Sequence, residues 1–206
     1  MKKRIAVFAS GGGTDFQSII DANEREQFCD IVYLIASKEG IGAIDRAEKH
    51  GINTAVFAKK DYPDLEKLYA ELTYLLHMNR VDYVVLAGWL KIIPESFIKN
   101  FEDRIINIHP SLIPSFCGTG MYGLNVHRAV LEYGAKISGC TVHFVNEIPD
   151  GGAIIAQTAV EVKADDTPES LQCRILEKEH ELLPYCVKML CYGKIVKDGR
   201  KVVIKA

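Results

Sequence analysis

Apolar and amphipathic segments alternate through the first half of the chain. Short apolar runs predict strands at Arg4–Ala9, Ile31–Ser37, Thr54–Phe57, Tyr83–Ala87 and Arg104–His109. Segments with apolar residues at the helical period predict helices at Asp15–Arg25, Ile41–His50 and Pro63–Met78. Strands that alternate with helices are joined by right-handed crossovers, so this half predicts an α/β fold with a parallel sheet. The run Val84–Ala87 is apolar without alternation, as expected of a central strand buried on both faces.

The second half predicts longer strands and a terminal hairpin. Ile137–Val145 and Ala153–Val162 are typical of strands, and the turn-rich segment Glu147–Gly152 connects them. The tail Gly193–Ala206 predicts a small hairpin with Asp198-Gly199 at its turn. The chain contains no repeat, low-complexity segment or Pro- or Ser-rich linker, so one domain over residues 1–206 is expected.

One long helix is predicted before this hairpin, ending at about Cys191. Thr167 is a good N-cap, Pro168 suits the first helical position, and Glu169 complements the helix dipole. The apolar stripe of this helix comprises Leu171, Ile175, Leu182, Leu183, Cys186 and Leu190. Glu179 falls inside the stripe, where a carboxylate must be paired, protonated or facing a cleft. Two interpretations remain open for it, a structural ion pair or a substrate-binding residue.

Composition and charge exclude several function classes. Of the 206 residues 48% are hydrophobic and 25% charged, the net charge is −2, and no basic tail or stripe occurs, which argues against a nucleic-acid partner. No apolar stretch reaches the roughly 18 residues of a membrane span. The apolar run Ile5–Ala9 is too short for a signal peptide, so a cytoplasmic protein is expected. The six cysteines form no C-x-x-C pair or zinc-type cluster, which favours free thiols and no metal site.

A glycine-rich turn, Ser10–Thr14, joins the first predicted strand to the first predicted helix. Glycines let the backbone approach a ligand closely, and the helix N-terminus offers N–H groups to an anion. We therefore predict a phosphate site at this turn, the alternative being a plain tight turn. The spacing is not that of a P-loop, and Ala36–Lys38 lacks the acid that a dinucleotide site would place there. Asp15 would repel a phosphate unless its carboxylate is neutralised or turned away.

Asn107 and His109 lie at the end of the fifth predicted strand, where open α/β sheets bind ligands. Because side chains alternate along a strand, both project from the same face. Asp150 follows the strand that carries His143. Each residue taken alone also has a structural interpretation, since most lone histidines are structural and Asp-Gly is a common turn.

These motifs together carry a resemblance. The segments Asn107–Pro114, His143–Val145 and Asp150–Gly152 resemble the family of formyltransferases that use 10-formyltetrahydrofolate. Ser10–Gln17 and Ala87–Ile92 resemble the phosphate loop and the folate-pocket segment of the members that act on glycinamide ribonucleotide; Glu179-His180 with Pro184 resembles their late helix.

The resemblance implies a Rossmann-like, mostly parallel seven-stranded sheet flanked by helices. It also implies transfer of a formyl group from 10-formyltetrahydrofolate, a co-substrate, to the amine of glycinamide ribonucleotide in purine biosynthesis, by a monomer or homodimer. Residues 1–100 would form the phosphate and ribonucleotide half, and residues 101–206 the catalytic and folate-binding half. The implied catalytic residues are Asn107, His109 and Asp150, with His143 supporting them. The implied substrate contacts are Gly11, Gly12, Gly13, Thr14, Asp15 and Glu179, and the implied folate contacts are Leu90, Lys91, Ile92, Ile93, Asn107 and Asp150.

In the implied chemistry Asn107 and His109 donate hydrogen bonds to a tetrahedral oxyanion, and Asp150 favours the protonated imidazole and orders a water. Relatives that act on methionyl-tRNA carry a further C-terminal domain and a basic surface, and formyltetrahydrofolate hydrolases usually carry an N-terminal regulatory domain. The sequence is expected to belong to neither group. A non-catalytic regulator that keeps the fold is the remaining alternative.

Overall fold

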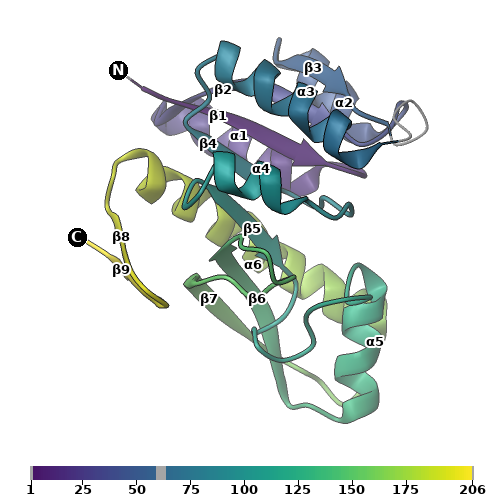
Figure 1. Cartoon of the computed structure of the whole chain (residues 1–206). Helices are drawn as coiled ribbons and strands as arrows, with labels where there is room; N and C mark the ends of the chain where they lie inside the picture. Colours follow the sequence, from purple (N-terminus) through teal and green to yellow (C-terminus); the bar gives the residue numbers. More distant parts are fainter. Residues whose placement is uncertain (1, 59–63, 206) are drawn as a thin grey trace. The chain divides into compact units, whose positions relative to one another are not determined.

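The computed structural model describes residues 2–58 and 64–205, which form two compact units, Met1–Ile106 and Asn107–Ala206 (Figure 1). One seven-stranded sheet has the order β3-β2-β1-β4-β5-β6-β7, and a two-stranded sheet pairs β8 with β9. The β1–β2, β1–β4 and β2–β3 pairs are parallel, and the β6–β7 pair is antiparallel. The predicted mostly parallel α/β sheet flanked by helices is confirmed. The assignment of the whole chain to one domain stays a prediction.

The first unit contains the strand–helix alternation. Its elements are β1 (Lys3–Ala9), α1 (Thr14–Glu26), β2 (Cys29–Ala36), α2 (Gly42–Lys49), β3 (Asn53–Val56), α3 (Leu65–Met78), β4 (Tyr83–Leu86) and α4 (Glu95–Asn100). Each predicted strand here is confirmed to within two residues. The predicted start of the third helix at Pro63 lies outside the described residues, and α3 begins at Leu65 after an Asp64 N-cap. Val84 and Val85 are fully buried, as expected of a central strand.

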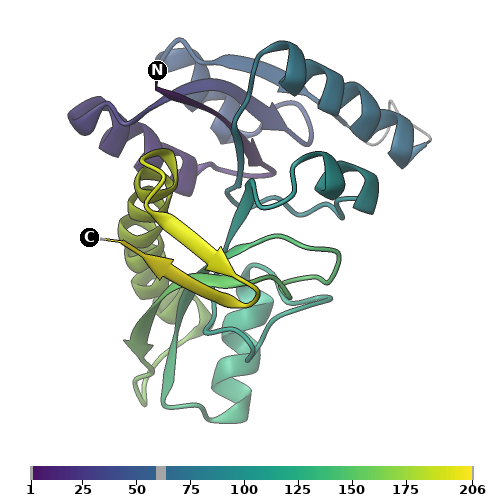
Figure 2. The same cartoon turned by 60° about the vertical axis from the view of Figure 1, so that its left-hand side comes forward.

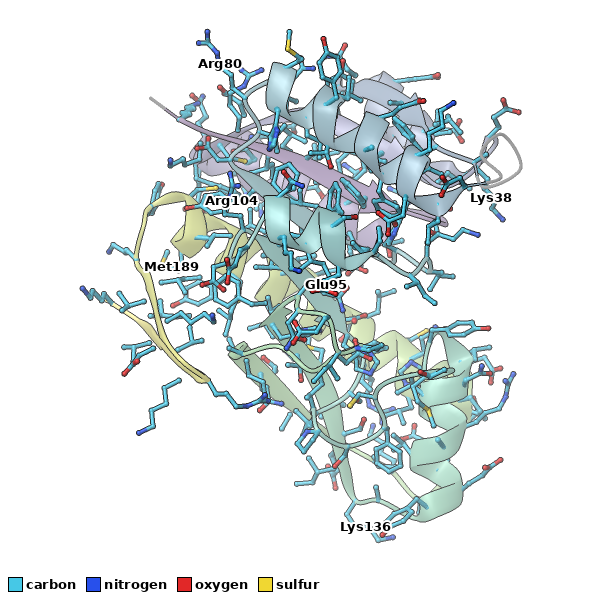
Figure 3. The ribbon with its side chains drawn as sticks, in the orientation of Figure 1. Lys38, Arg80, Glu95, Arg104, Lys136 and Met189 are labelled. Atoms are coloured by element: carbon cyan, nitrogen blue, oxygen red, sulfur yellow. The ribbon has the colours of Figure 1, made fainter. Side chains whose placement is uncertain are left out.

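An aromatic cluster in the first unit anchors the segment after β4. The Trp89 ring lies edge-on to Phe8 at 5.1 Å, and its indole N–H donates to the Tyr69 hydroxyl at 3.2 Å. Burial raises the pKa of Tyr69 to about 12. Phe101 lies at the end of α4 with the Arg104 guanidinium 5.1 Å from its ring centre, and Figure 3 labels this arginine. The cluster holds Trp89 inward, next to the segment predicted to bind folate.

The second unit begins within β5 (Ile105–His109) and continues with α5 (Leu124–Tyr133), β6 (Ile137–Phe144), β7 (Ile154–Glu161), α6 (Pro168–Cys191), β8 (Ile195–Asp198) and β9 (Lys201–Ile204). The α6 helix packs against β6 and β7, and the β8–β9 hairpin contacts β7 through β9 (Figure 2). The Thr167 N-cap is confirmed. Its hydroxyl accepts from the Ser170 N–H, and the Ser170 hydroxyl accepts from the Thr167 N–H.

Two short helices were not expected from the sequence, α4 and α5. Six residues are too few for a helical period to be read in α4, so its pattern cannot be told from a loop. The α5 helix follows the glycine-rich stretch Gly118–Gly123, which hides its start because no N-cap side chain marks it. Both helices are stabilised by packing, and neither begins with an N-cap side chain that could be recognised in the sequence.

Candidate active site

The Asn107 amide and the His143 imidazole form a direct pair in the second unit. Asn107 Nδ2 lies 3.1 Å from His143 Nε2, and His143 Nδ1 lies 2.8 Å from the Phe144 carbonyl oxygen. A carbonyl can only accept, so His143 Nδ1 carries a proton, and in the neutral ring Nε2 accepts from Asn107. His143 thereby orients the Asn107 amide. One Asn107 N–H is used in this pair, and the amide has a second one to offer.

His109 is held by a backbone carbonyl on one side and faces a carboxylate on the other. Its Nε2 lies 3.0 Å from the Phe116 carbonyl oxygen, so this nitrogen carries a proton. Its Nδ1 lies 3.6 Å from Asp150 Oδ2, and only 4% of the residue is exposed. Since Nε2 is occupied, Nδ1 is the ring nitrogen that is left for a substrate. Donation from Nδ1 requires the imidazolium form.

Asp150 joins these two pairs into one cluster. Its Oδ2 accepts from the Gly118 N–H at 2.7 Å, and its Oδ1 lies 3.6 Å from His143 Nε2. Asp150 has a φ of 54°, in the left-handed region that non-glycine residues rarely adopt. The structure therefore brings together the three residues predicted to be catalytic, Asn107, His109 and Asp150, and the supporting His143. It adds two backbone groups that side-chain motifs do not reveal, the Phe116 carbonyl and the Gly118 N–H.

The electrostatics of the cluster depend on the competition between burial and charge. Burial lowers the pKa of His109, and it outweighs the raising effects of the Asp150 charge and the Phe116 hydrogen bond. Burial raises the pKa of Asp150, but the His143 and His109 rings and the Gly118 N–H outweigh it, and that pKa falls below its usual range. The expectation that Asp150 favours the imidazolium is right for its own effect but incomplete, because burial has the larger one.

A further buried histidine, His127 of α5, lies in the same electrostatic environment. It is 1% exposed, and its Nδ1 has no hydrogen-bond partner among the described residues. Burial, with a smaller effect of His109, lowers its pKa from 6.5 to about 4. His127 is therefore neutral in the folded protein at neutral pH, and the sequence analysis did not single it out.

Replacing His127 by glutamine is expected to reduce the acid sensitivity of folding. The unfolded chain binds a proton at this residue below about pH 6.5 and the folded chain only below about pH 4. Folding therefore loses about 3 kcal/mol of stability across this window as the pH falls. The variant should lack this loss, which urea unfolding at pH 7 and pH 4.5 measures.

The His77→Gln variant, which removes an exposed imidazole, is the matched control for this measurement. Asp15 contributes with the opposite sign, because its pKa is raised to about 6, but it does so equally in wild type and variant. Parallel pH dependence of stability in wild type and His127→Gln would contradict the prediction.

The glycine-rich turn lies in the first unit, between β1 and α1. The Gly11 carbonyl accepts from the Ala43 N–H at 3.2 Å, and the Gly12 carbonyl accepts from Arg46 Nε at 2.8 Å. Because a trans peptide points its C=O and N–H in opposite directions, the N–H groups of Gly12 and Gly13 point away from these partners. A side chain on Gly13, with φ 73°, would lie 2.7 Å from the Ala43 Cβ. The turn thus presents N–H groups at the start of α1, and Arg46 is a contact that the sequence analysis missed.

Asp15, the residue expected to repel a phosphate, lies in an environment that disfavours its charged form. Burial raises its pKa from 3.8 to about 6. A carboxyl group with that pKa is far easier to protonate than an exposed one. The carboxyl is still mostly ionised at pH 7, so the expected negative charge beside the turn weakens only as the pH falls toward 6.

The predicted folate segment leaves apolar side chains in solvent. Leu90 is 57% exposed and Ile92 79% exposed, and Lys91 is also exposed, whereas Ile93 is half-buried. The Leu90 N–H donates to the Ser10 hydroxyl at 3.1 Å, which ties this segment to the glycine-rich turn within the first unit. Exposed leucine and isoleucine beside a fixed backbone are features of a ligand-binding segment.

Glu179 is buried in α6, with 7% of the residue exposed. Its predicted place within the apolar stripe is confirmed, since Leu171, Ile175 and Leu183 are buried on the same helix.

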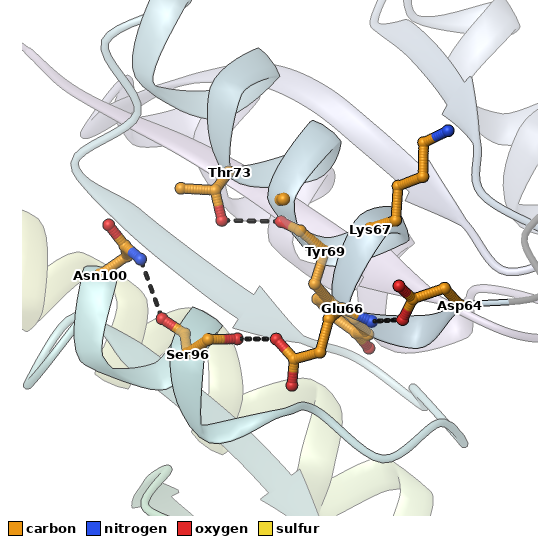
Figure 4. A pocket seen from close by; sticks show the side chains of 8 residues that line it. Asp64, Glu66, Lys67, Tyr69, Thr73, Ser96 and Asn100 are labelled. Atoms are coloured by element: carbon orange, nitrogen blue, oxygen red, sulfur yellow. Dashed lines mark hydrogen bonds between the residues drawn. The ribbon is translucent and has the colours of Figure 1, made fainter.

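Two cavities lie outside the predicted site residues, and the second borders the site through Phe116, whose carbonyl bonds His109. The first, of about 450 Å³, lies between α3 and α4 and is drawn in Figure 4; it is lined by Asp64, Glu66, Lys67, Tyr69, Ala70, Thr73, Ser96 and Asn100. The second, of about 430 Å³, is lined by Leu112, Ser115, Phe116, Tyr133, Ala135, Ile137 and Ser138. Neither includes a residue that the sequence assigned to the site. In the first, the polar side chains bond one another, as in the 2.5 Å Ser96–Glu66 hydrogen bond.

Two further searches cover the described part of the chain. Residues 2–58 and 64–205 contain no group of three or more His, Cys, Asp or Glu side chains placed to hold a metal ion. Over the same residues, no helix combines the length and the apolar character that crossing a membrane requires.

An α/β sheet that brings an amide and an imidazole of one strand together with a carboxylate from a neighbouring loop is equipped to act on a carbonyl carbon. The sequence model of the family described as Formyl transferase matches residues 3–187, and the chain belongs to this family.

Individual relatives agree with this membership. The chain is 45% identical over 196 residues to the phosphoribosylglycinamide formyltransferase, chloroplastic, of Arabidopsis thaliana. The alignment covers 94% of this chain and 67% of that protein. It thus spans about two thirds of the length of the plant relatives it matches. It is 36% identical to the crystal structure of glycinamide ribonucleotide transformylase 1 from Symbiobacterium toebii, with a TM-score of 0.93 over 100% of this chain and 95% of that one. It is also 26% identical to a formyltetrahydrofolate deformylase from Pseudomonas syringae, with a TM-score of 0.90 over 100% of this chain and 67% of that chain.

Proposed function

We propose that the chain transfers the formyl group of 10-formyltetrahydrofolate to the amine of glycinamide ribonucleotide, a step of purine biosynthesis. The observation that carries the proposal is the cluster of Asn107, His109, His143 and Asp150 in a chain of the formyl transferase family. Relatives named for this reaction match nearly the whole chain, which supports the choice of acceptor.

The chemistry follows from the hydrogen-bonding groups of the cluster. The substrate amine forms a bond to the formyl carbon, and the carbonyl oxygen becomes a tetrahedral oxyanion. The second Asn107 N–H and His109 Nδ1 donate to that oxygen, and the negative charge that develops there favours the imidazolium form of His109 against the effect of burial. The bond from the formyl carbon to N10 of the folate then breaks, and the proton lost by the amine ends on N10. Asp150 supplies the countercharge for the imidazolium and orders a water that relays this proton.

The two substrates are assigned to the remaining predicted residues. The N–H groups of Gly12 and Gly13, with Gly11, Thr14 and Asp15, receive the phosphate end of the ribonucleotide. The folate pteridine contacts Leu90, Lys91, Ile92 and Ile93, because flat heterocycles favour apolar surfaces with a few backbone hydrogen bonds. Glu179 accepts hydrogen bonds from the ribose hydroxyls or the glycinamide.

Hydrolysis of the formyl folate is the second candidate function. It is favoured by one observation, the similarity to the Pseudomonas syringae deformylase at a TM-score of 0.90. The same oxyanion donors serve both reactions, because water can replace the amine as the nucleophile. The acceptor dependence of the reaction therefore separates the two.

The purified chain is expected to release tetrahydrofolate from 10-formyltetrahydrofolate only when glycinamide ribonucleotide is present. The measurement is the rate of folate deformylation with and without that acceptor, with glycine as a control amine.

In the same assay Glu179→Gln should raise the Michaelis constant for the ribonucleotide and leave that for folate and the melting temperature nearly unchanged. Equal rates with and without acceptor would identify a hydrolase, and no turnover under either condition would favour a non-catalytic regulator.

We further propose that the chain has no nucleic-acid partner, that it is a cytoplasmic enzyme, and that it acts as a monomer or homodimer. The net charge of −2 and the six free cysteines support the first two points. Sedimentation velocity at two protein concentrations measures the oligomeric state, and fractionation of the source cells measures the location.

A further inference from the structure

The C-terminal hairpin makes a direct contact with the loop that carries Asp150. Arg200, which with Gly199 forms the two-residue turn between β8 and β9, donates from Nη1 to the Gly151 carbonyl oxygen at 3.1 Å. The β9 strand also contacts β7, the strand that leaves this loop (Figures 1 and 2). The hairpin lies beyond residues 3–187, which the family model matches.

The contacted loop has little freedom on its other sides. The Gly151 N–H donates to the Ile148 carbonyl at 2.8 Å and closes a tight turn around Asp150. A Cβ on Gly152 would lie 1.7 Å from the Phe144 carbonyl oxygen, so this glycine is packed directly against the β6 backbone. Asp150 itself has the left-handed φ of 54°. The Gly151 carbonyl is the group of this turn that points to the hairpin.

We propose that Arg200 is a positioning residue that holds the Asp150 carboxylate in register with His109 by fixing the Gly151 peptide. A residue held in a left-handed conformation keeps it only while its surroundings determine it. The Arg200 hydrogen bond fixes the Gly151–Gly152 peptide, the second peptide after Asp150, and the Gly118 N–H fixes the carboxylate itself. The kinetic part of this inference rests on the proposed function, whereas the structural part does not.

The titration of His109 tests the structural part without any substrate. Asp150 raises the pKa of His109 against the effect of burial, so a less closely held carboxylate lets that pKa fall further. His143 and His127 also lie near His109 and are unchanged in the variants. The ring signals of His109, followed by NMR against pH, should therefore move in Arg200→Ala toward the midpoint found in Asp150→Asn. Lys201→Ala, which removes an exposed cation of the same hairpin, is the matched control and should titrate like wild type.

The kinetic part predicts that Arg200 variants lose turnover while substrate binding is retained. Arg200→Ala should lower kcat roughly tenfold, the effect of one misplaced catalytic contact, with Michaelis constants within about twofold. Arg200→Lys keeps a donor and should recover part of the loss. An unchanged His109 titration in Arg200→Ala would overturn the inference whatever the enzyme activity, and so would a lower melting temperature with unchanged titration and kcat. A shifted titration in a protein without formyl transfer would retain the positioning role and reject only the proposed function.

Discussion

Replacing Asn107 or His109 by alanine is expected to lower kcat by about 10²–10³, with Michaelis constants changed only a few-fold. Each residue offers one donor to the oxygen that becomes negative in the transition state, and the loss of one such donor has an effect of this size. Substrate binding precedes the development of that charge, so it should be little affected. The measurement is steady-state turnover of each variant with both substrates at saturation.

Asn100→Ala and His77→Ala remove exposed side chains of the same two types and are the controls, with turnover expected to stay near that of wild type. His143 should respond differently from Asn107, because it orients the amide and does not itself face the substrate. Losses below tenfold in both Asn107→Ala and His109→Ala, with melting temperatures retained, would show that the cluster does not act on the chemical step.

The strands and the long helix could be predicted because their signals are local. The run Val84–Leu86 is apolar on both faces, and it forms a buried strand. Thr167, Pro168 and Glu169 predicted a helix start, and α6 begins there. Such elements are specified by residues adjacent in sequence, so tertiary contacts do not need to be known.

Residue types at strand ends, together with the family resemblance, predicted the side-chain cluster. Asn107 and His109 share a face of β5 because strand periodicity is two, and β6 delivers His143 beside them. The sequence analysis could not find the Phe116 carbonyl or the Gly118 N–H. Every residue carries those backbone groups, so only the fold shows which ones are used.

The balance of charge and burial was the other feature beyond the reach of the sequence. Proximity of Asp150 to His109 predicts a raised imidazole pKa, but the sequence does not show how far the imidazole is removed from water. In the folded chain His109 is almost fully buried, and burial prevails. The same cause gives Asp15 a pKa of about 6, whereas its neighbours in sequence indicated only a repelling charge. Burial depends on contacts distant in sequence, so these two pKa values follow from the structure alone.

Replacing Gly152 by alanine is expected to destabilise the fold by about 3 kcal/mol, the upper range for forcing an extra methyl into a packed site, which lowers Tm by roughly 10 °C. The added Cβ would lie 1.7 Å from the Phe144 carbonyl oxygen, which must move. That carbonyl also accepts from His143 Nδ1, and His143 orients Asn107. The substitution should therefore lower kcat at least tenfold even at temperatures where the variant is folded. Thermal unfolding and turnover at 15 °C measure the two effects.

Gly134→Ala separates steric overlap from backbone conformation. Gly134 ends α5 with a φ of 75°, and a Cβ there would meet no atom within 4 Å. Its replacement carries only the left-handed conformational penalty of about 1 kcal/mol, with kcat unchanged. Equal losses of stability in the two variants would show that the Phe144 carbonyl yields freely to the new methyl group. An unchanged kcat in Gly152→Ala would show that the path from this carbonyl through His143 to the Asn107 amide does not set the rate of the reaction.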